Sequence, residues 1–367
     1  MNLTFNNIID DLIKKNISFV IYTLPNSESP VLIVQKSLKL FKSTNEDIDH
    51  IKGFIVAPFE SANTNIIHYL KSDFILEADN STTDLELFLN QQNNSTRIHQ
   101  TNNHISDKEE YLERATYLIN KLKTGDLSKV VLSRVSKNKL ADNFKFSNFY
   151  ESLSSKYPNA FVYLLNSEET GIWAGASPET LIKRENKTIE TTALAGTRLL
   201  SDYIAYPEWA DKEKEEQHLV SIYIENLLSE LGIKDYKEEG PITIEAGKLV
   251  HLKTKFSIKN DCLKDQLGLF IKGLHPTPAV CGLPKADAYG LIEKAENHSR
   301  NLYTGFLGPW NIRDKSHLFV NLRCAEFSKN NMLAYVGGGL TSESNALDEW
   351  QETENKLETM LSVVENL

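Results

Sequence analysis

The pattern of apolar and polar positions along the chain predicts many short strands and a few long amphipathic helices. Alternating or continuous apolar runs indicate strands in FVIYTL, VLIVQ, GFIVAPF, KVVLSR, AFVYLLN, TGIWAGA, TLIKRE, LFVNLRCAEF and MLAYVGGGL. Apolar positions that recur every three or four residues indicate helices over 211–231, 288–298 and 345–365. Because the strands arrive in adjacent groups and not in strict alternation with helices, the sequence favours an α+β layered fold.

A polar segment from Asn90 to Glu110 interrupts this pattern, since it is almost free of large apolar residues. Such a composition is typical of a surface loop. At its end, Ser106 and Asp107 precede two glutamates, which predicts the start of a helix. That helix is expected to continue through YLERATYLINKLK to a glycine stop.

The amino-acid composition indicates which classes of binding partner and which cellular compartment the protein is suited to. The 367 residues are 41% hydrophobic and carry a net charge of −10, which disfavours binding to nucleic acid or to an anionic membrane. The three cysteines are far apart and show no CxxC spacing, so neither a zinc site nor a disulfide framework is indicated. No signal peptide is recognisable, and no apolar stretch approaches the ~20 residues that span a bilayer. We therefore expect a soluble, cytoplasmic protein.

Two predicted helices each carry a pair of glutamates three residues apart. Glu213 and Glu216 form one pair, and Glu349 and Glu352 form the other, with Lys356 four residues beyond Glu352. Like charges on one helix face repel, and Mg²⁺ prefers carboxylate oxygens, so these pairs are candidate metal ligands. The alternative is a solvated charged face, which suits the charge run around Glu213 better than it suits Glu352 beside Trp350.

Several short segments contain residues whose placement is unusual. KVVLSR begins an apolar strand with Lys129, which either reaches water at the strand end or is buried for a purpose. GASPET places Glu179 after a proline, as in a turn or helix start, and TTALAGTR ends an expected strand at Gly196-Thr197. LRCAEF puts Arg323 inside an apolar strand, where it needs an anionic partner.

Two further segments are rich in glycine or proline. YVGGGL carries three consecutive glycines from Gly337 onwards, which usually mark a close approach to the backbone by another group. HPTPAVCGLPK combines three prolines and a glycine with small residues, and it predicts a rigid, irregular wall.

Taken together and in this order, the segments resemble the chorismate-utilising enzymes, which comprise the isochorismate, salicylate, anthranilate and aminodeoxychorismate synthases. The matching segments are KVVLSR, GASPE, LAGTR, KEKEEQ, VHL, HPTPAVCGLPK, RNLYTGFLG, LRCAEF, VGGGL and EWQETENK. They run from about Glu109 to the C-terminus, whereas the first hundred residues match only in general character. The resemblance implies large antiparallel sheets packed face to face as a core with helices outside. It assigns residues 1–100 to an N-terminal α/β part of the same sandwich and 101–367 to the chorismate-binding catalytic region.

The resemblance also implies a role for each matching residue. Glu216 and Glu352 correspond to direct Mg²⁺ ligands, with Glu213 and Glu349 acting through water, and the ion would bind the ring carboxylate of chorismate. The enolpyruvyl carboxylate would be held by Arg323, Lys356 and the Gly337 backbone, with Tyr303 beside it. His251, Gly196 and Thr197 would line the ring. KEKEEQ departs from the more usual KDxxEH, because Gln217 stands where the family has histidine and Glu213 where it has aspartate.

Three positions distinguish the members of this family. Amine-adding members carry glutamine where this chain has Lys129, and aminodeoxychorismate synthases carry a nucleophilic lysine where it has Ala195. Ala279 matches isochorismate synthases, whereas salicylate synthases tend to have threonine there. The resemblance thus implies a Mg²⁺-dependent isochorismate synthase in which Lys129 is the general base and Glu179 the general acid.

The roles of acid and base require a lowered lysine pKa and a raised glutamate pKa, and burial shifts both in these directions. A salicylate synthase is the alternative, and an anthranilate-type synthase or a non-catalytic chorismate-binding protein is disfavoured. The resemblance further suggests a monomer, and menaquinone synthesis is expected ahead of siderophore synthesis as the pathway.

Overall fold

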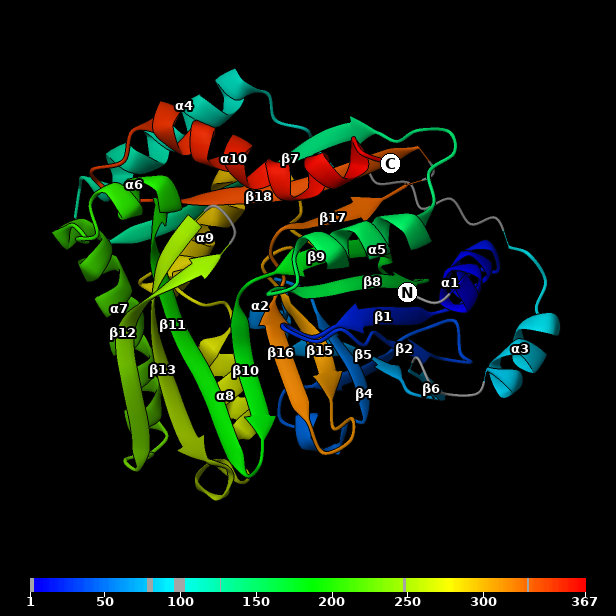
Figure 1. The fold of residues 1–367 in the computed structure, drawn as a ribbon. Coiled ribbons are helices and arrows are strands. Elements are labelled where there is room, and N and C mark those ends of the chain that lie inside the picture. The colour runs from blue at the N-terminus through cyan, green and yellow to red at the C-terminus, as the bar shows by residue number, and fades with distance from the viewer. Residues whose placement is uncertain (1–2, 78–81, 96–102, 126, 247–248, 329) are drawn as a thin grey trace.

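The computed structural model describes residues 3–77, 82–95, 103–125, 127–246, 249–328 and 330–367. These residues form two nine-stranded antiparallel sheets that face each other, with helices on the outer faces (Figure 1). The predicted α+β layered fold is therefore confirmed. No helix in the described ranges is long and apolar enough to cross a membrane.

The first sheet runs in the order β14-β7-β18-β17-β9-β8-β1-β2-β6. Its strands are β14 (Gly282–Leu283), β7 (Lys129–Lys139), β18 (Asn331–Leu340), β17 (Cys324–Phe327), β9 (Gly171–Ser177), β8 (Phe161–Ser167), β1 (Phe19–Thr23), β2 (Val31–Val34) and β6 (Phe74–Leu76). The chain thus places KVVLSR beside the glycine-rich strand, with Gly337 opposite Ser133 in the register.

The second sheet runs in the order β12-β13-β11-β10-β16-β15-β4-β5-β3. Its strands are β12 (Tyr236–Ala246), β13 (Leu249–Lys259), β11 (Thr188–Leu199), β10 (Thr180–Glu185), β16 (Ser316–Val320), β15 (Phe306–Trp310), β4 (Gly53–Ala57), β5 (Ile66–Lys71) and β3 (Phe41–Thr44). The long strands β11, β12 and β13 extend beyond the first sheet at one end of the molecule (Figure 1).

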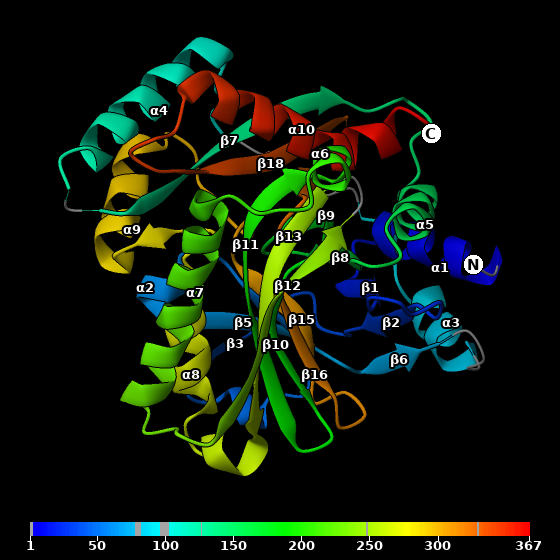
Figure 2. The same cartoon turned by 60° about the vertical axis from the view of Figure 1, so that its left-hand side comes forward.

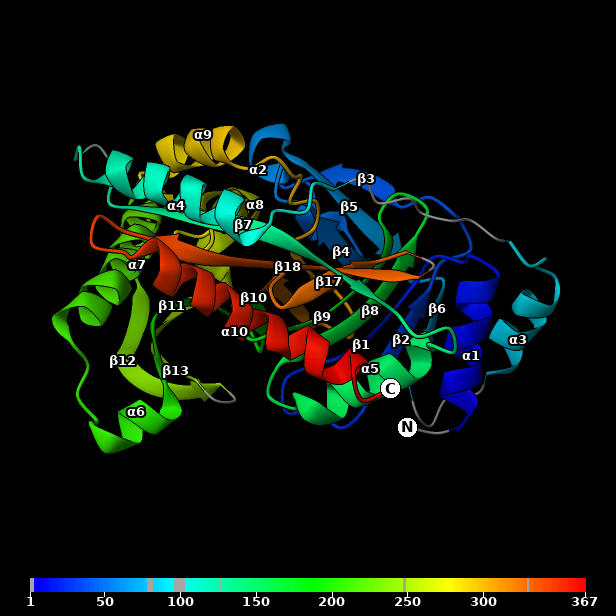
Figure 3. The same cartoon turned by 90° about the horizontal axis from the view of Figure 1, so that it is seen from above.

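Helices cover the outer face of each sheet because their apolar side chains pack against the apolar side chains of the strands. On the first sheet, α1 (Leu3–Lys14), α5 (Phe146–Lys156) and α10 (Ala346–Val364) share one apolar cluster with the strands. On the second sheet, α7 (Asp211–Glu230) and α8 (Leu267–Leu274) do the same (Figure 2). Viewed from above, α4 (Lys108–Leu122) lies alongside α10, near β7 and β18 (Figure 3). The remaining helices are α2 (Ser61–Thr64), α3 (Thr83–Asn90), α6 (Leu200–Ala205) and α9 (Lys285–Ala295), with 3₁₀ turns at Ile48–His50 and Asn260–Leu263.

The space between the sheets is filled by aromatic side chains. Phe161 of β8 and Phe319 of β16 stack across it with their ring centroids 4.1 Å apart, and Tyr22, Phe54 and Trp173 are buried in the same cluster. Burial of such large rings from both sheets contributes about 1.5–3 kcal/mol for each Phe-sized side chain, so this layer holds the sheets together.

The chain passes between the sheets close to two of the predicted site residues. β9 of the first sheet leads through Pro178 and Glu179 into β10 of the second, so the expected turn or helix start is a crossing between sheets. LFVNLRCAEF is not one strand, as its apolar run predicted. Its two halves belong to β16 and β17, and Arg323 lies between them with φ +49°. A single apolar run can therefore hide a change of sheet.

The N-terminal residues contribute to both sheets. Of the predicted strands, FVIYTL and VLIVQ contain β1 and β2 of the first sheet, and GFIVAPF contains β4 of the second. The division at residue 100 remains a prediction. Within the polar segment, residues 96–102 lie outside the described ranges, and the helix predicted after Asp107 is α4, whose first turn is capped by the Asp107 carboxylate.

Candidate active site

A cavity of about 140 Å³ opens between the sheets where β7, β11, β13 and β18 come together. The structure brings to its wall Lys129, Glu179, Gly196, Thr197, Glu216, His251, Ala279, Tyr303, Arg323, Gly337, Glu352 and Lys356. Segments separated by more than two hundred positions in the sequence therefore meet around one space.

Lys129 is the first residue of β7 and is only 5% exposed. Its ammonium group forms a salt bridge with Glu216 of α7. A Cβ atom at Gly339 would lie 2.6 Å from Lys129 Cε, so the lysine side chain crosses directly over the glycine-rich strand. Lys129 thus does not extend into bulk water, and the close approach predicted for YVGGGL is confirmed.

The other two glycines of that strand also lie against site residues. A Cβ at Gly337 would lie 2.9 Å from the Tyr303 hydroxyl, and one at Gly338 would lie 2.8 Å from Glu349 Oε2. A larger residue at either position would displace a polar group from the site.

Glu179 is 6% exposed and lies at the crossing between the sheets. Burial raises the pKa of its carboxyl group to about 7, although the hydrogen bond from Thr277 and the charge of Lys129 both oppose this shift. Thr277 Oγ1 donates to Glu179 Oε1 over 3.3 Å. At neutral pH this side chain can therefore carry a proton, as a general acid must.

The acidic pairs lie on two helices that pack on opposite sheets, α7 and α10. Burial alone would raise the pKa of Glu216, but its pairing with Lys129 holds it below the usual value. Lys356 lies 2.6 Å from Glu352 Oε1 and holds the pKa of Glu352 low. Glu216 and Glu352 line the same cavity, and the negative charge of Glu216 opposes the lowering of the Glu352 pKa.

The chemistry of this acidic group fits a hard divalent cation. Glu213 Oε2 and Glu349 Oε2 are buried without a hydrogen-bond partner, and buried carboxylate oxygens are costly unless paired or bound to a cation. As they stand, no three acidic, histidine or cysteine side chains in the described ranges are gathered closely enough to hold a metal ion. Lysine ammonium groups instead neutralise Glu216 and Glu352. The residues match a magnesium ligand set in type, and the ligand assignment remains a prediction.

Two further cationic groups, Arg323 and Lys356, line the same cavity. Lys356 Nζ donates to Gly337 O over 2.8 Å. The guanidinium of Arg323 donates to Thr359 Oγ1 at 3.1 Å and to the Lys356 carbonyl at 3.4 Å. These acceptors are uncharged, and burial lowers the pKa of Arg323. A bound carboxylate would compensate the buried guanidinium with charge-assisted hydrogen bonds.

His251 and Thr197 face each other in the register of β13 and β11, with 3.1 Å between Thr197 Oγ1 and His251 Nδ1. Burial lowers the pKa of His251 to about 4, and Arg323 adds to the effect, so the imidazole is neutral. Gly196 does not end its strand as expected. It lies at a register shift inside β11 with φ +72°, and a Cβ there would meet the Glu213 carbonyl at 3.0 Å.

Sequence reasoning did not single out two polar groups that the fold brings to the site. Thr277 belongs to the same proline-rich segment as Ala279 and donates to Glu179. Tyr335 lines the cavity, stacks on Tyr303 with centroids 5.8 Å apart and donates to buried Glu326. The threonine between two prolines was a usable signal, whereas Tyr335 looked like an ordinary apolar strand position.

Comparison with known proteins agrees with this geometry. The family model described as chorismate binding enzyme matches residues 59–365. The chain is 28% identical over 261 residues to the vibriobactin-specific isochorismate synthase of Vibrio cholerae, covering 69% of this chain and 66% of that protein. It is 30% identical over 247 residues to the isochorismate synthase EntC of Escherichia coli K12, covering 65% of this chain and 63% of that protein. The matched region thus spans about two thirds of the length of these relatives.

Solved structures show the same fold over nearly the whole chain. A putative 2,3-dihydroxybenzoate-specific isochorismate synthase, DhbC from Bacillus anthracis, superposes with a TM-score of 0.77 at 23% identity, covering 98% of this chain and 99% of that one. The menaquinone-specific isochorismate synthase MenF from Escherichia coli gives 0.74 at 20% identity, covering 97% and 91%. From the family match over most of its length, from the shared fold and from the residues gathered at its cavity, the chain belongs to the chorismate-binding enzyme family.

Proposed function

We propose that this protein converts chorismate reversibly to isochorismate, with Mg²⁺ as cofactor. The observation that carries the proposal is the presence of Lys129 and Glu179 in the wall of one cavity, with the pKa of the buried Glu179 raised to about 7. The reaction removes a hydroxyl group from one ring carbon and adds one to another. It therefore requires a base and a protonated acid that both reach the same substrate. The isochorismate synthases among the relatives support the same reaction.

Binding in this proposal relies on charge. Arg323 and Lys356, with the backbone at Gly337, hold the enolpyruvyl carboxylate, and neutral His251 with Thr197 lines the ring. Magnesium would be held by Glu216 and Glu352, with Glu213 and Glu349 behind them, and would supply positive charge for the ring carboxylate. Because these anion-binding groups are concentrated in the cavity, a protein of net charge −10 can still bind a dianion.

The reaction then needs two proton transfers. Lys129, acting as a free amine, removes a proton from the water that attacks C2. The C2–O bond forms, the ring double bonds shift, and the C4–O bond breaks. Glu179 gives its proton to the departing C4 hydroxyl, which leaves as water. General acid and base steps are each worth about 10² to 10⁴ in rate.

Isochorismate made in this way would serve menaquinone or siderophore synthesis, and the relatives include enzymes named for each. Menaquinone is the proposed pathway, and the protein is proposed to act as a cytoplasmic monomer. Light scattering during size-exclusion chromatography tests the oligomeric state.

The deciding experiment incubates the purified protein with chorismate and Mg²⁺ and identifies the products by chromatography. Isochorismate without pyruvate is expected. Salicylate with pyruvate would show a salicylate synthase, and product formation only with added ammonia would show an amine-adding enzyme. Lys129→Gln is expected to lose turnover, and wild-type turnover in that variant would remove the base from the mechanism.

The same assay tests the metal. Glu352→Ala is expected to raise the Mg²⁺ concentration needed for half-maximal rate, because it removes one proposed ligand. Full activity of Glu352→Ala at low Mg²⁺ would contradict the ligand assignment.

A further inference from the structure

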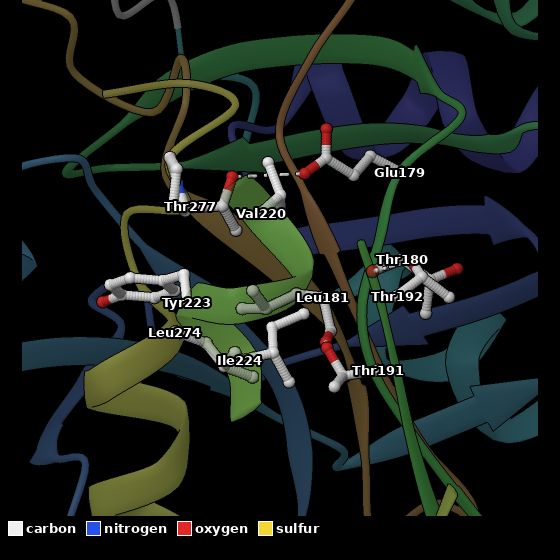
Figure 4. Close-up of a pocket in the computed structure, with 11 residues that line it drawn as sticks. Glu179, Thr180, Leu181, Thr191, Thr192, Val220, Tyr223, Ile224, Leu274 and Thr277 are labelled. Atoms are coloured by element: carbon white, nitrogen blue, oxygen red, sulfur yellow. Dashed lines mark hydrogen bonds between the residues drawn. The ribbon is translucent and has the colours of Figure 1, made fainter. Parts of the chain in front are cut away.

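A second, smaller cavity of about 10 Å³ lies next to Glu179 (Figure 4). Glu179 belongs to its lining and to the lining of the substrate cavity, so this residue borders both spaces. The smaller cavity has a mixed wall, formed by Glu179, Thr180, Leu181, Thr191, Thr192, Val220, Tyr223, Ile224, Leu274, Thr277 and Pro278. A space of this size holds about one water molecule when several polar partners surround it.

The proposed reaction creates a need for such a water. In each turnover Lys129 gains a proton from the attacking water, and Glu179 loses one to the departing hydroxyl. The overall reaction neither consumes nor releases protons, so before the next turnover Glu179 must regain a proton and Lys129 must release one. Glu179 is 6% exposed, and during turnover chorismate or its product would fill the larger cavity that Glu179 also lines. A supply of protons that does not depend on the substrate cavity would allow the acid to be reset.

We propose that the small cavity is a one-water site from which Glu179 is reprotonated, and that Thr277 is the positioning residue that holds the carboxyl group between the two cavities. This inference rests on the proposed isochorismate synthase function.

The hydrogen bonds at the cavity wall suit a bound water. Thr191 Oγ1 donates to Leu181 O at 2.7 Å, and Thr192 Oγ1 donates to Thr180 O at 3.2 Å. The Tyr223 hydroxyl donates to Gly273 O at 2.6 Å. Because each of these protons is committed to a carbonyl, the hydroxyl oxygens keep lone pairs that can accept from a water. When that water gives a proton to the Glu179 carboxylate, it takes one from the Tyr223 hydroxyl, which turns away from Gly273 O. Tyr223 in turn takes a proton from the Lys285 ammonium group 3.4 Å away, and the partly exposed Lys285 recovers it from solvent.

Thr277 fixes the carboxyl group at this boundary. Its hydroxyl donates to Glu179 Oε1 over 3.3 Å, and Thr277 lines the small cavity itself (Figure 4). The side of Glu179 away from this contact faces the substrate cavity and its charged and titratable groups, Lys129, Glu216, His251, Tyr303, Arg323, Glu352 and Lys356. On the small-cavity side the titratable neighbours are Tyr223 and, 3.4 Å from its hydroxyl, the ammonium group of Lys285.

The test fills the small cavity without touching a polar group. Val220→Ile adds one methylene to the wall, and Val363→Ile makes the same change at a buried position of α10. Single-turnover and steady-state rates of isochorismate formation are measured for both variants in H₂O and D₂O.

In Val220→Ile the single-turnover rate should match the wild type, because Glu179 already holds its proton. The steady-state kcat should fall, by less than the roughly 10²-fold expected from loss of the acid. The solvent isotope effect on kcat should rise. Val363→Ile should show none of these changes. A normal kcat in Val220→Ile would overturn the proposal, as would an equal fall in both rates, which indicates disturbed packing.

Thr277→Val and Thr277→Ser provide a second test that does not rely on overpacking. Thr277→Val removes a hydrogen bond that holds the Glu179 pKa down, so that pKa should rise. The basic limb of the pH profile of kcat should therefore move to higher pH. The value of kcat itself should fall, with little change in KM. Thr277→Ser should restore both properties. An unmoved basic limb in a folded Thr277→Val variant would reject the positioning role. Failure of the wild-type enzyme to make isochorismate would contradict the proposed function. Failure of the cavity proposal would instead appear only in these variants, so the two outcomes can be told apart.

Discussion

Two buried carboxylates of this protein, Glu179 at the cavity and Glu296 behind it, show how partners decide the chemistry of an acidic group. Both are nearly inaccessible, at 6% and 9% exposure. Burial raises the pKa of Glu179 to about 7, since only one long hydrogen bond and the charge of Lys129 oppose it. Burial would also raise the pKa of Glu296, but the adjacent Arg300 guanidinium outweighs that effect and holds the pKa below its usual value.

The contacts around Glu296 explain its different state. Glu296 Oε1 accepts from the Ser133 amide at 2.7 Å and the Ser133 hydroxyl at 2.8 Å, and the Arg300 guanidinium donates to both carboxylate oxygens at 2.6 and 2.8 Å. Arg300 also donates to Val131 O at 2.8 Å and to Val280 O at 2.9 Å, and both valines line the substrate cavity.

A fully paired carboxylate thus fixes the position of two cavity walls, while a nearly unpaired one remains available to donate a proton. Burial is common to both residues, and pairing determines which of them can act as an acid.

Glu179→Gln should give the largest effect in this comparison. The amide keeps the size of the side chain but cannot donate an acidic proton, so kcat should fall by about 10² to 10⁴. Steady-state kinetics and thermal unfolding measure the two properties together. A folded variant with wild-type kcat would show that another group is the acid.

Arg300→Met should instead act on folding, because it leaves the Glu296 charge buried and unpaired. Loss of one partner of a buried pair costs about 3–5 kcal/mol of unfolding free energy, which urea denaturation measures. The double variant Glu296→Met/Arg300→Met should lose less than Arg300→Met alone, since no isolated charge remains. Lys259→Met, which removes a fully exposed pair with Asp235, is the control and should leave stability unchanged. Equal losses in the single and double variants would argue against an ion-pair role.

The two carboxylates should contribute to the pH dependence of stability with opposite signs. The folded pKa of Glu179 lies above the usual 4.5, so its stabilising contribution is present at low pH and is lost as pH rises towards 7. Glu179→Gln should therefore gain stability relative to the wild type between pH 4.5 and 7. The folded pKa of Glu296 lies below 4.5, so its contribution is present above that pH and is lost as pH falls.

Glu296→Gln should accordingly be most destabilised near neutral pH, with a smaller difference under acid conditions. Denaturation series at several pH values test both variants. Parallel pH profiles for the two variants would contradict the assignment of opposite shifts.

The pH dependence of turnover should show the smallest of these effects. Because the acid must be protonated, kcat should decline above about pH 7, approaching tenfold per pH unit. The decline should be absent from the residual activity of Glu179→Gln. A wild-type kcat that stays constant from pH 7 to 9 would remove Glu179 from the rate-determining proton transfer.

Local patterns were sufficient to predict much of the secondary structure. The helices expected over 211–231 and 345–365 are α7 and α10, and the apolar runs of KVVLSR and MLAYVGGGL lie in β7 and β18. Patterns failed where the chain changes sheet or bends within a strand, as at Arg323 and Gly196. A hydrophobic run predicts that its residues are buried, but it does not predict to which sheet they belong.

The sequence by itself determined the types of residue at the site, their helical spacing and the motifs by which the family is recognised. Only the tertiary structure decided that Lys129 is paired with Glu216 while Glu179 has no cationic group in direct contact among the described residues. It also decided that Thr277 and a small cavity lie beside Glu179. The physical reason is that pKa values and cavities depend on desolvation and on partners distant in the sequence. Such contacts form only when both sheets and their helices have packed.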